Sequence, residues 1–317
     1  MSSKSLVSVI IIFLNAESFI QEAVESVFAQ TYKKWEILLI DDGSTDSSTK
    51  VALRYEAQNP GQVRYLEHLN HQNLGMSASR NLGIQNSQGD YVAFLDADDV
   101  WLPHKLERQV AILNSQPEAA MLYGNALYWY SWTGNPKDYQ RDHKPDLGVQ
   151  PNSLIEPPNL LPLYLKGAAA VPCPCSVLVR RHALDRIGGF EESFPGMYED
   201  QAFYAKMALA NSIFVSEECL ELYRQHPDAS TAIANRMGQE VNARQFFLQW
   251  LKRYLVEKGI KDPKVCQVLN RELWRLAHPA RLPTSENIRY LVRWTKKWLL
   301  KIEERILPAA IRHWLWY

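Results

Sequence analysis

The stretch Tyr91-Val-Ala-Phe-Leu-Asp-Ala-Asp-Asp99 joins an apolar run to three carboxylates, those of Asp96, Asp98 and Asp99. The run is short, rich in aromatic and branched residues, and preceded by Gly89-Asp90, so it predicts a buried strand. Ligands of open α/β sheets bind at the carboxyl ends of strands. Asp96 and Asp98 are two positions apart, so they would point to one side of an extended chain. Together they predict a site for a hard divalent cation that leaves positions for substrate phosphates.

Helix capping is the alternative interpretation of these carboxylates. Acidic residues after a strand often cap the next helix, and Asp99 could do so for a segment that starts near Leu102. One cap needs one side chain, whereas three carboxylates stand within four positions. The stretch therefore favours a metal–nucleotide site over a cap alone.

The first half of the chain alternates between strand and helix patterns. Apolar runs predict strands over 7–14, 35–40 and 63–67, and apolar spacing predicts helices over about 17–30, 44–57 and 102–113. The second strand ends in Asp41-Asp-Gly-Ser-Thr-Asp46, so carboxylates follow two of the strands. Strand–helix–strand units of this length imply parallel crossovers. We therefore predict an α/β fold with a doubly wound sheet that binds a nucleotide.

Two common kinds of nucleotide site are disfavoured. Asn15-Ala-Glu-Ser stands where a dinucleotide-binding site needs glycines, and no Gly-Lys-Ser/Thr phosphate loop occurs. Instead, the stretch Asn73-Leu-Gly-Met-Ser-Ala-Ser-Arg-Asn-Leu-Gly83 carries small residues that allow close backbone approach. A helix that begins there would favour an anion at its N-terminus, and Arg80 could contact a phosphate. A small-residue helix packed tightly on the sheet is the alternative.

Aromatic residues mark the start of the second half. Five of them lie among polar residues: Tyr128, Trp129, Tyr130, Trp132 and Tyr139. They predict either a hairpin with an aromatic face or a surface that stacks on sugars, and both interpretations stay open. Short strands are expected over 172–179, 213–215 and 219–223.

Glu199 and Asp200 precede an apolar stripe that predicts a helix, so both would lie at its start. One carboxylate there could complement the helix dipole. Two adjacent carboxylates could instead present a general base. His226 ends the last expected strand, and its position alone assigns it no role.

These pieces occur together, and in the same order, in a known family. The chain resembles family 2 glycosyltransferases of the GT-A fold across about residues 6–230. The matching pieces are the first strand with Asn15, the Asp41–Asp46 stretch, residues 73–83, residues 94–99, Gly188-Gly-Phe-Glu-Glu192, Glu199-Asp200 and Tyr223-Arg-Gln-His226. The resemblance implies a catalytic domain over 1–230, with a nucleotide-binding half of about 1–120 and an acceptor half of about 121–230. A helical C-terminal extension would follow over 231–317.

The resemblance also implies an activity. A sugar would be transferred from a nucleotide diphosphate donor to a hydroxyl group, with inversion of the anomeric centre. The expected donor is a UDP-sugar. The acceptor would be a glycan or a lipid-linked molecule in polysaccharide, lipopolysaccharide or glycolipid assembly. By position, the residues that would bind the nucleotide sugar are Asn15, Glu17, Asp42, Arg80, Asp96, Asp98 and His226. Among these, Asp42 would contact the base or ribose and Asp96 the ribose.

The same resemblance implies the catalytic roles. Asp98 and His226 would hold Mg²⁺ or Mn²⁺ at the diphosphate. The metal would act as a Lewis acid and help the diphosphate to leave. Asp200 would act as the general base, with Glu199 in support. Two departures stand out. The family often carries a proline before Tyr-Asn at the end of the first strand, where this chain has Phe13-Leu14-Asn15, so the residues that form the uracil side of the pocket are not assigned. The Gln-x-x-Arg-Trp motif of processive synthases is absent, which favours addition of single sugars.

Two rival functions make different demands on the sequence. A nucleotidyltransferase would need a basic, glycine-rich loop after the first strand, and Asn15-Ala-Glu-Ser is acidic instead. A catalytically inactive nucleotide-sugar-binding protein would be expected to lose Asp98 or Asp200, and both are present.

Composition adds further limits. The 317 residues include 35 basic and 35 acidic side chains, so net charge gives no argument for a nucleic-acid partner. Cys173-Pro-Cys175 is too tight for an ordinary disulfide, and no paired zinc-ligand pattern occurs, which predicts reduced thiols in a cytoplasmic protein. No uncharged run reaches the roughly 18 residues that a membrane-spanning helix needs.

The C-terminal part carries helical patterns near 246–254, 265–276 and 288–306. Residues 281–317 hold eight basic against three acidic residues, a balance of +5, together with four tryptophans. Basic residues and tryptophan on an amphipathic helix suit an anionic membrane surface, which predicts peripheral contact with the inner face of the membrane. A helix packed on the catalytic domain with a solvated basic face is the alternative.

Overall fold

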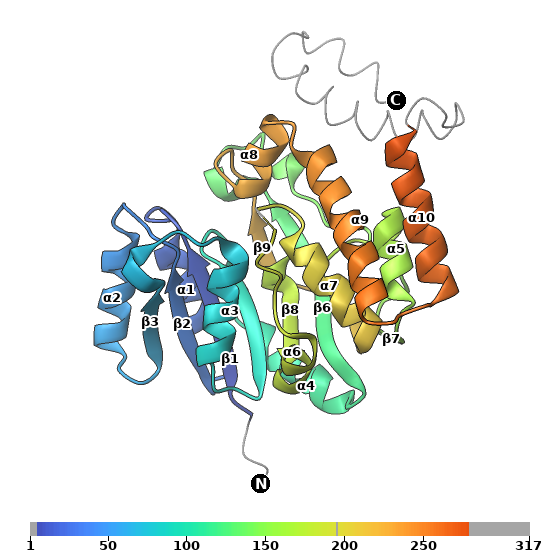
Figure 1. Ribbon diagram of the computed structural model, residues 1–317. Coiled ribbons are helices and arrows are strands. Elements are labelled where there is room, and N and C mark those ends of the chain that lie inside the picture. The colour runs from blue at the N-terminus through green and yellow to red at the C-terminus, as the bar shows by residue number, and fades with distance from the viewer. Residues whose placement is uncertain (1–4, 195, 279–317) are drawn as a thin grey trace. The chain divides into compact units, whose positions relative to one another are not determined.

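The computed structural model describes residues 5–194 and 196–278 (Figure 1). The chain divides into two compact units, residues 1–269 and residues 270–317, and each is considered by itself. The domain boundaries expected near residues 120 and 230 stay predictions. The interpretation of 281–317 as a membrane-binding tail, with its helix near 288–306, falls outside the described residues.

One mixed sheet runs through the first unit. Within the described residues it has nine strands in the order β3-β2-β1-β4-β8-β6-β9-β5, and β7 pairs with β9. The strands are β1 (Val7–Phe13), β2 (Trp35–Asp41), β3 (Val63–Glu67), β4 (Tyr91–Asp96), β5 (Val100–Trp101), β6 (Ala119–Trp129), β7 (Ser153–Ile155), β8 (Val177–Arg180) and β9 (Ser212–Arg224). The first four are parallel, whereas β8 runs antiparallel to both β4 and β6. The predicted α/β class is confirmed.

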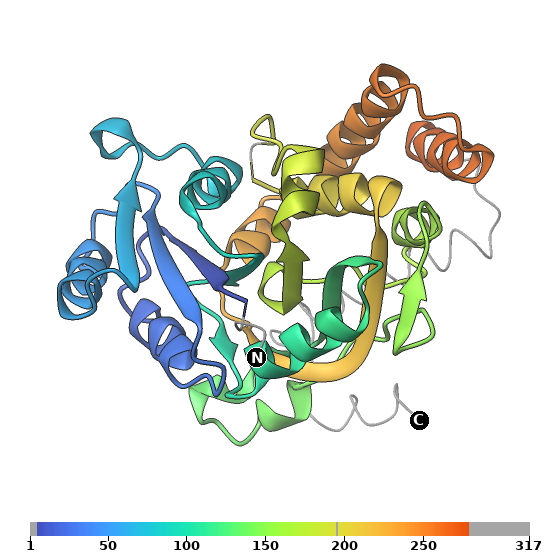
Figure 2. The ribbon, with the colours of Figure 1, turned by 90° about the horizontal axis from the view of Figure 1, so that it is seen from below.

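Helices cover both faces of this sheet (Figures 1 and 2). The helices of the described residues are α1 (Ile20–Phe28), α2 (Ser48–Gln58), α3 (Met76–Asn86), α4 (Lys105–Ser115), α5 (Leu160–Lys166), α6 (Arg181–Ile187), α7 (Glu199–Ala210), α8 (Ser230–Arg236), α9 (Glu240–Glu257) and α10 (Pro263–Ala277). Buried side chains of α1, α2 and α4 share one apolar cluster with β1 and β2. On the opposite face, Phe203 of α7 packs edge-on against Phe94 of β4, with ring centroids 6.0 Å apart. The sheet is therefore doubly wound, as predicted.

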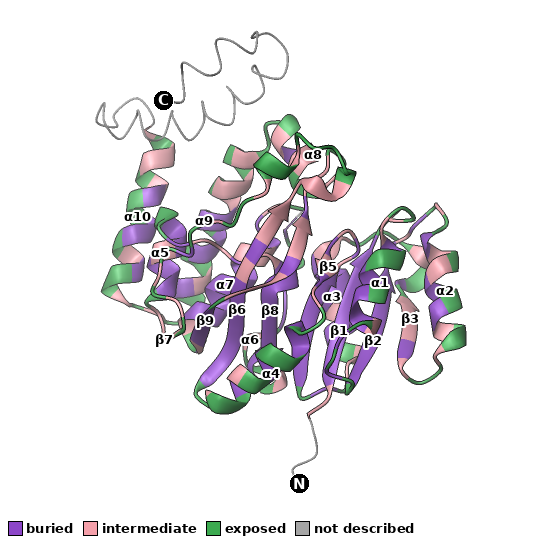
Figure 3. Cartoon of the chain, turned by 180° about the vertical axis from the view of Figure 1, so that it is seen from behind, coloured by how far each residue is buried: buried purple, intermediate pink, exposed green. Residues whose placement is uncertain are grey.

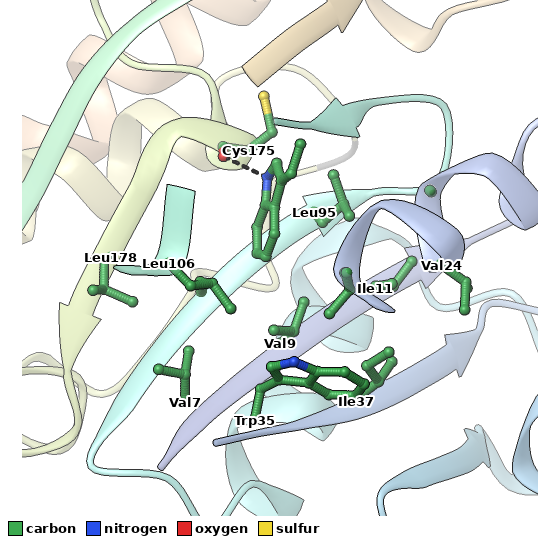
Figure 4. Close-up of a cluster of buried hydrophobic side chains, with 14 of the residues drawn as sticks. Val7, Val9, Ile11, Val24, Trp35, Ile37, Leu95, Leu106, Cys175 and Leu178 are labelled. Carbon is green, nitrogen blue, oxygen red and sulfur yellow. Dashed lines mark hydrogen bonds between the residues drawn. The ribbon is translucent and has the colours of Figure 1, made fainter. Parts of the chain in front are cut away.

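The core lies where the apolar runs cross the middle of the sheet. Every residue of β1 is buried, as expected for a central strand with parallel neighbours on both sides. Figure 3 shows buried residues concentrated on the strands, and Figure 4 shows Val9, Ile11 and Ile37 in the cluster under α1. Helix α1 contributes Ile20, Ala23, Val24 and Val27, which recur at helical spacing.

Helix α3 lies close to the sheet because it has a glycine at the contact. A Cβ atom at Gly83 would come within 2.5 Å of a side-chain carbon of Ile10 in β1. Only a residue without a Cβ allows this approach. The tight packing of a small-residue helix, which was the alternative for residues 73–83, is therefore present. It fixes the position of Arg80, which is on the same helix.

The second half of the sheet departs from the local predictions. The aromatic segment does not form a hairpin, because β6 is followed by two short 3₁₀ turns and the returning chain makes one isolated bridge, between Tyr128 and His143. Residues 213–215 and 219–223 belong to one long strand, β9, which pairs with β6. Strand β6 therefore pairs with the distant strand β9, and not with the segment that follows it in a hairpin, as one interpretation predicted.

Candidate active site

Two acidic strand ends meet at one edge of the sheet. In the parallel register, Phe13 of β1 lies opposite Asp41 of β2, and Ile12 lies opposite Asp96 of β4. The strand ends on either side of β1 therefore carry a carboxylate at nearly the same level. This is the edge where the sequence predicts a ligand site.

Asp96 and Asp98 have different partners. Strand β4 ends at Asp96, so the chain is not extended as far as Asp98. The prediction that both side chains point to one side because the chain is extended is therefore wrong. The carboxylate of Asp96 contacts Arg80, with Oδ1 2.8 Å from Nη2. Asp98 Oδ2 lies 3.0 Å from His226 Nε2.

The Asp98–His226 pair suits a metal ion bound together with a phosphate. The Asp98 side chain is 29% exposed, which leaves carboxylate oxygen open to a ligand. Within the described residues, no group of three or more His, Cys, Asp or Glu side chains is arranged to hold a metal. Mg²⁺ commonly takes one or two protein ligands and completes its shell with water and substrate phosphates. The carboxylate of Asp98 fits that requirement, and the imidazole of His226 lies beside it.

Asp99 has a structural role that the capping interpretation missed. Helix α4 begins at Lys105, and the fully buried carboxylate of Asp99 accepts a hydrogen bond of 2.9 Å from the backbone N–H of Arg224 instead. The capping interpretation is wrong, because the partner of Asp99 comes from β9. Burial and the nearby carboxylates of Asp98 and Asp96 raise the pKa of Asp99 well above its usual value.

Arg224 fastens the acidic turn to the end of β9. Its Nε donates to the backbone oxygen of Asp98 at 2.7 Å, and its guanidinium also pairs with Glu22 of α1. The aromatic rings of Phe19, Trp129 and Trp132 surround the guanidinium at 4.9, 4.6 and 5.1 Å. Cation–π contacts of this kind stabilise a buried arginine. Arg224 is not among the predicted site residues, although it ends β9 two positions before His226.

Arg80 joins the two halves of the site. Its side chain is 2% exposed, and it pairs with Asp96 at the end of β4 and with Glu199 at the start of α7, at 2.8 and 3.2 Å. The guanidinium also stacks on the ring of Phe190 at 5.3 Å. The structure therefore brings together three of the predicted residues through one buried cation.

The start of α7 presents two adjacent carboxylates in different settings. Glu199 is buried, and burial together with the neighbouring Asp200 raises its pKa to about 7, against the opposing effect of Arg80. Burial also raises the pKa of Asp200, which is half-buried and accepts a hydrogen bond from the N–H of Gln201. The preceding residue, Tyr198, has a φ of 70°, which is unusual for a bulky side chain. A conformation of this kind, held by its surroundings, is typical of functional sites.

The predicted nucleotide-binding residues near β1 and β2 tie two loops together. Asn15 Oδ1 accepts from the N–H of Thr45 at 2.8 Å, and Glu17 Oε2 accepts from the N–H of Ser47 at 2.9 Å. Asp42 is buried, and its carboxylate accepts from the N–H groups of Leu74 and Gly75. Asn15 and Glu17 are exposed beside this edge, whereas Asp42 anchors the backbone that leads into α3.

The aromatic segment after β6 contacts the site next to His226. Trp132 lies near His226 and donates its indole N–H to the backbone oxygen of Gln225 at 2.9 Å. Tyr130 stacks with Arg141 at 4.1 Å, and Tyr139 is 63% exposed. Part of the aromatic set therefore packs around Arg224, and part lies at the surface.

Within the described residues, no helix is long and apolar enough to cross a membrane.

Comparison with known proteins finds a family model and several relatives that match the chain. The model of the family described as glycosyl transferase family 2 matches residues 8–188. An uncharacterized glycosyltransferase of Rickettsia conorii is 32% identical over 75% of this chain, and one of Nostoc is 28% identical over 90%. The chain spans 37% of the length of the Rickettsia protein and 80% of that of the Nostoc protein.

Solved structures share the fold. S. aureus TarS in complex with UDP-GlcNAc has a TM-score of 0.62 at 17% identity, over 88% of this chain and 77% of its own. The mannosyltransferase PcManGT of Pyrobaculum calidifontis, in complex with GDP-Man and Mn²⁺, has a TM-score of 0.60 at 19% identity, over 99% of this chain and 84% of its own. These values confirm the predicted GT-A fold. The matched family model covers more than half of the chain, and the chain therefore belongs to glycosyl transferase family 2.

Proposed function

We propose that this chain catalyses inverting transfer of a single sugar from a UDP-sugar to a hydroxyl group of a glycan or lipid-linked acceptor. The observation that carries the proposal is the Arg80 bridge between Asp96 and Glu199. It holds a carboxylate of the nucleotide edge and the start of α7 in one buried network. A transferase needs this proximity, because the departing nucleotide and the attacking hydroxyl act on the same carbon atom.

Asp200 is proposed as the general base. A hydroxyl group is a weak nucleophile until its proton is removed in the transition state. The raised pKa of Asp200 brings the carboxylate closer to the range in which a base works near neutral pH. Glu199 supports it by fixing Arg80, which in turn stabilises negative charge at Asp200. A base that faces the sugar opposite the leaving group produces inversion.

Asp98 and His226 are the residues that would hold Mg²⁺ or Mn²⁺. Such an ion, when bound, would supply charge neutralisation for the departing diphosphate. Their hydrogen bond orients the imidazole of His226 toward the carboxylate. Arg224 keeps the turn that carries Asp98 against β9. The Mn²⁺ in the PcManGT structure supports the proposal.

The exposed side chains of Asn15 and Glu17, beside the Asp42-anchored loop, are proposed to line the nucleotide pocket. The two solved structures bind donors with different bases, UDP-GlcNAc and GDP-Man. We assign uridine from the resemblance of the motif set. Asp42 would then act mainly through the backbone of residues 74–75 that it holds.

The acceptor side is proposed to involve the exposed part of the aromatic segment, around Tyr130 and Tyr139. Aromatic faces suit the C–H groups of sugars, and such a surface fits polysaccharide, lipopolysaccharide or glycolipid assembly. Contact of residues 281–317 with the inner face of a membrane would bring the protein to a lipid-linked acceptor. Binding of the full chain to anionic liposomes at low salt tests that contact.

The proposed function is tested by incubating the protein with UDP- and GDP-sugars and measuring release of free nucleoside diphosphate, with and without Mn²⁺. We expect UDP release that depends on the metal and increases with an acceptor glycan. Pyrophosphate formed from a nucleoside triphosphate and a sugar phosphate would favour the nucleotidyltransferase alternative. Donor binding without any turnover would favour an inactive binding protein.

A further inference from the structure

Two thiols face each other behind the acidic turn. With only Pro174 between Cys173 and Cys175, the spacing was expected to be too tight for an ordinary disulfide, yet their sulfur atoms lie 3.1 Å apart. Disulfide sulfurs lie about 2.05 Å apart, so roughly 1 Å of approach would close a bond. Cys175 is fully buried, whereas Cys173 is half-buried.

The segment that carries these thiols is held to the acidic turn. The carbonyl of Cys175 accepts a hydrogen bond of 2.9 Å from the indole N–H of Trp101, which Figure 4 marks with a dashed line. Trp101 belongs to β5, which begins one residue after Asp99. Asp99 in turn accepts from the backbone of Arg224. A shift of Cys175 would therefore act on the turn between Asp96 and Asp99.

A small oxidant can reach the pair. A cavity of about 20 Å³ is lined by Cys173 together with Tyr123, Tyr128 and Ser176, among others. This volume accepts a molecule about the size of water, because about 10–15 Å³ suffices for one. A peroxide of similar size is a better match than a bulky disulfide such as oxidised glutathione. Cys173 is the more exposed of the two thiols and lines this cavity, so the oxidant meets its sulfur first.

We propose that Cys173 and Cys175 form a reversible, peroxide-sensitive disulfide that slows the transferase. Hydrogen peroxide transfers an oxygen atom to the Cys173 sulfur, giving a sulfenic acid and one water molecule. The Cys175 sulfur then attacks the Cys173 sulfur and breaks its S–O bond. The released hydroxyl group takes up the thiol proton of Cys175 and leaves as water. Two thiols have lost two hydrogens, and peroxide has become two water molecules. Only the effect on rate rests on the proposed function.

The disulfide is tested in a Cys219→Ser/Cys266→Ser variant of the full chain, which retains only this pair of the four cysteines. After treatment with dilute hydrogen peroxide, we expect titratable thiols to fall from two to none and the mass to fall by about 2 Da, with dithiothreitol reversing both. Two remaining thiols, or a mass increased by whole oxygen atoms, would overturn the disulfide. Cys175→Ser in the same background is the matched control, in which Cys173 has no partner thiol and should gain oxygen atoms instead of losing hydrogens.

The effect on rate is measured on the same samples. We expect about tenfold slower transfer after oxidation, within the roughly 10²-fold that a 1 Å misplacement can cost, and recovery with dithiothreitol. The Cys173→Ser/Cys175→Ser variant should lose no activity under the same treatment. A disulfide that forms without changing the rate would overturn the regulatory part, and the mass measurement stands even if no transfer is found.

Discussion

The turn after β4 and the start of α7 both present carboxylates to the site, in opposite environments. Asp98 is partly open to solvent and pairs with an imidazole. Glu199 and Asp200 lie beside the buried guanidinium of Arg80, and burial raises the pKa of both. The first setting suits a carboxylate that binds a cation. The second suits a carboxylate that exchanges a proton, so the two ends of one site divide the binding and the chemistry between them.

The largest effect is expected from Asp200→Asn. The amide keeps the size of the side chain but cannot accept the acceptor proton, so turnover should fall by about 10²–10⁴-fold. Glu199→Gln is the matched control and should cost less, because Glu199 is assigned a supporting role. Steady-state turnover of both variants checks this. A normal rate for Asp200→Asn with a slow Glu199→Gln would reverse the two roles.

Arg80→Met would break the connection between the two ends. Removing one partner from a buried ion pair costs about 3–5 kcal/mol of stability, because the remaining charges are left unpaired. The free energy of unfolding in urea is compared for Arg80→Met and Arg80→Lys. Lysine keeps the charge but lacks the planar guanidinium, so the comparison separates the two contributions. Equal stability of the wild type and Arg80→Met would mean that the bridge does not hold the halves together.

Arg224→Lys would loosen only the end of the site that is proposed to bind a metal. Lysine keeps the charge but cannot reproduce the fork that holds Asp98 and Glu22. A residue that orients a metal ligand is worth about 10–100-fold in metal affinity, so the Mn²⁺ concentration for half-maximal activity should rise by about that factor. Arg108→Lys, at an exposed ion pair with Glu218, is the control and should change little. An unchanged Mn²⁺ requirement would remove Arg224 from the site.

The smallest effect concerns pH. Because the pKa of Asp200 is raised, its base form is lost at a higher pH than for an ordinary aspartate, whose pKa is about 3.9. Activity should therefore rise with pH across an acid limb centred above about pH 4. A profile of kcat/KM between pH 4 and 8 measures this limb. A limb centred below about pH 4 would contradict the raised pKa.

The first half of the chain was predictable because its signals are local. The strand expected over 63–67 matches β3, and the runs that start at Val7 and Trp35 begin β1 and β2. Each run is bounded by polar or turn residues, and each strand pairs in parallel with a neighbour from the same alternating series. Periodicity and turn chemistry therefore suffice there.

The second half was less predictable because its pairings are distant. Strand β6 pairs with β9 about ninety residues later, and no local pattern marks that partner. The same holds for side chains. Arg80 was expected at a phosphate, yet its guanidinium contacts Glu199, 119 positions away. Arg224 was missed because its role depends on the carbonyl of Asp98 and on three aromatic rings from other segments.

The division of labour between the two carboxylate settings is tested most directly by donor binding. The dissociation constant for the UDP-sugar is measured with and without Mn²⁺ for Asp98→Asn and Asp200→Asn, beside the wild type. The account predicts that Asp98→Asn loses the gain in affinity that Mn²⁺ gives, whereas Asp200→Asn keeps it while its turnover falls. Mn²⁺-dependent binding that survives in Asp98→Asn but is lost in Asp200→Asn would contradict the account.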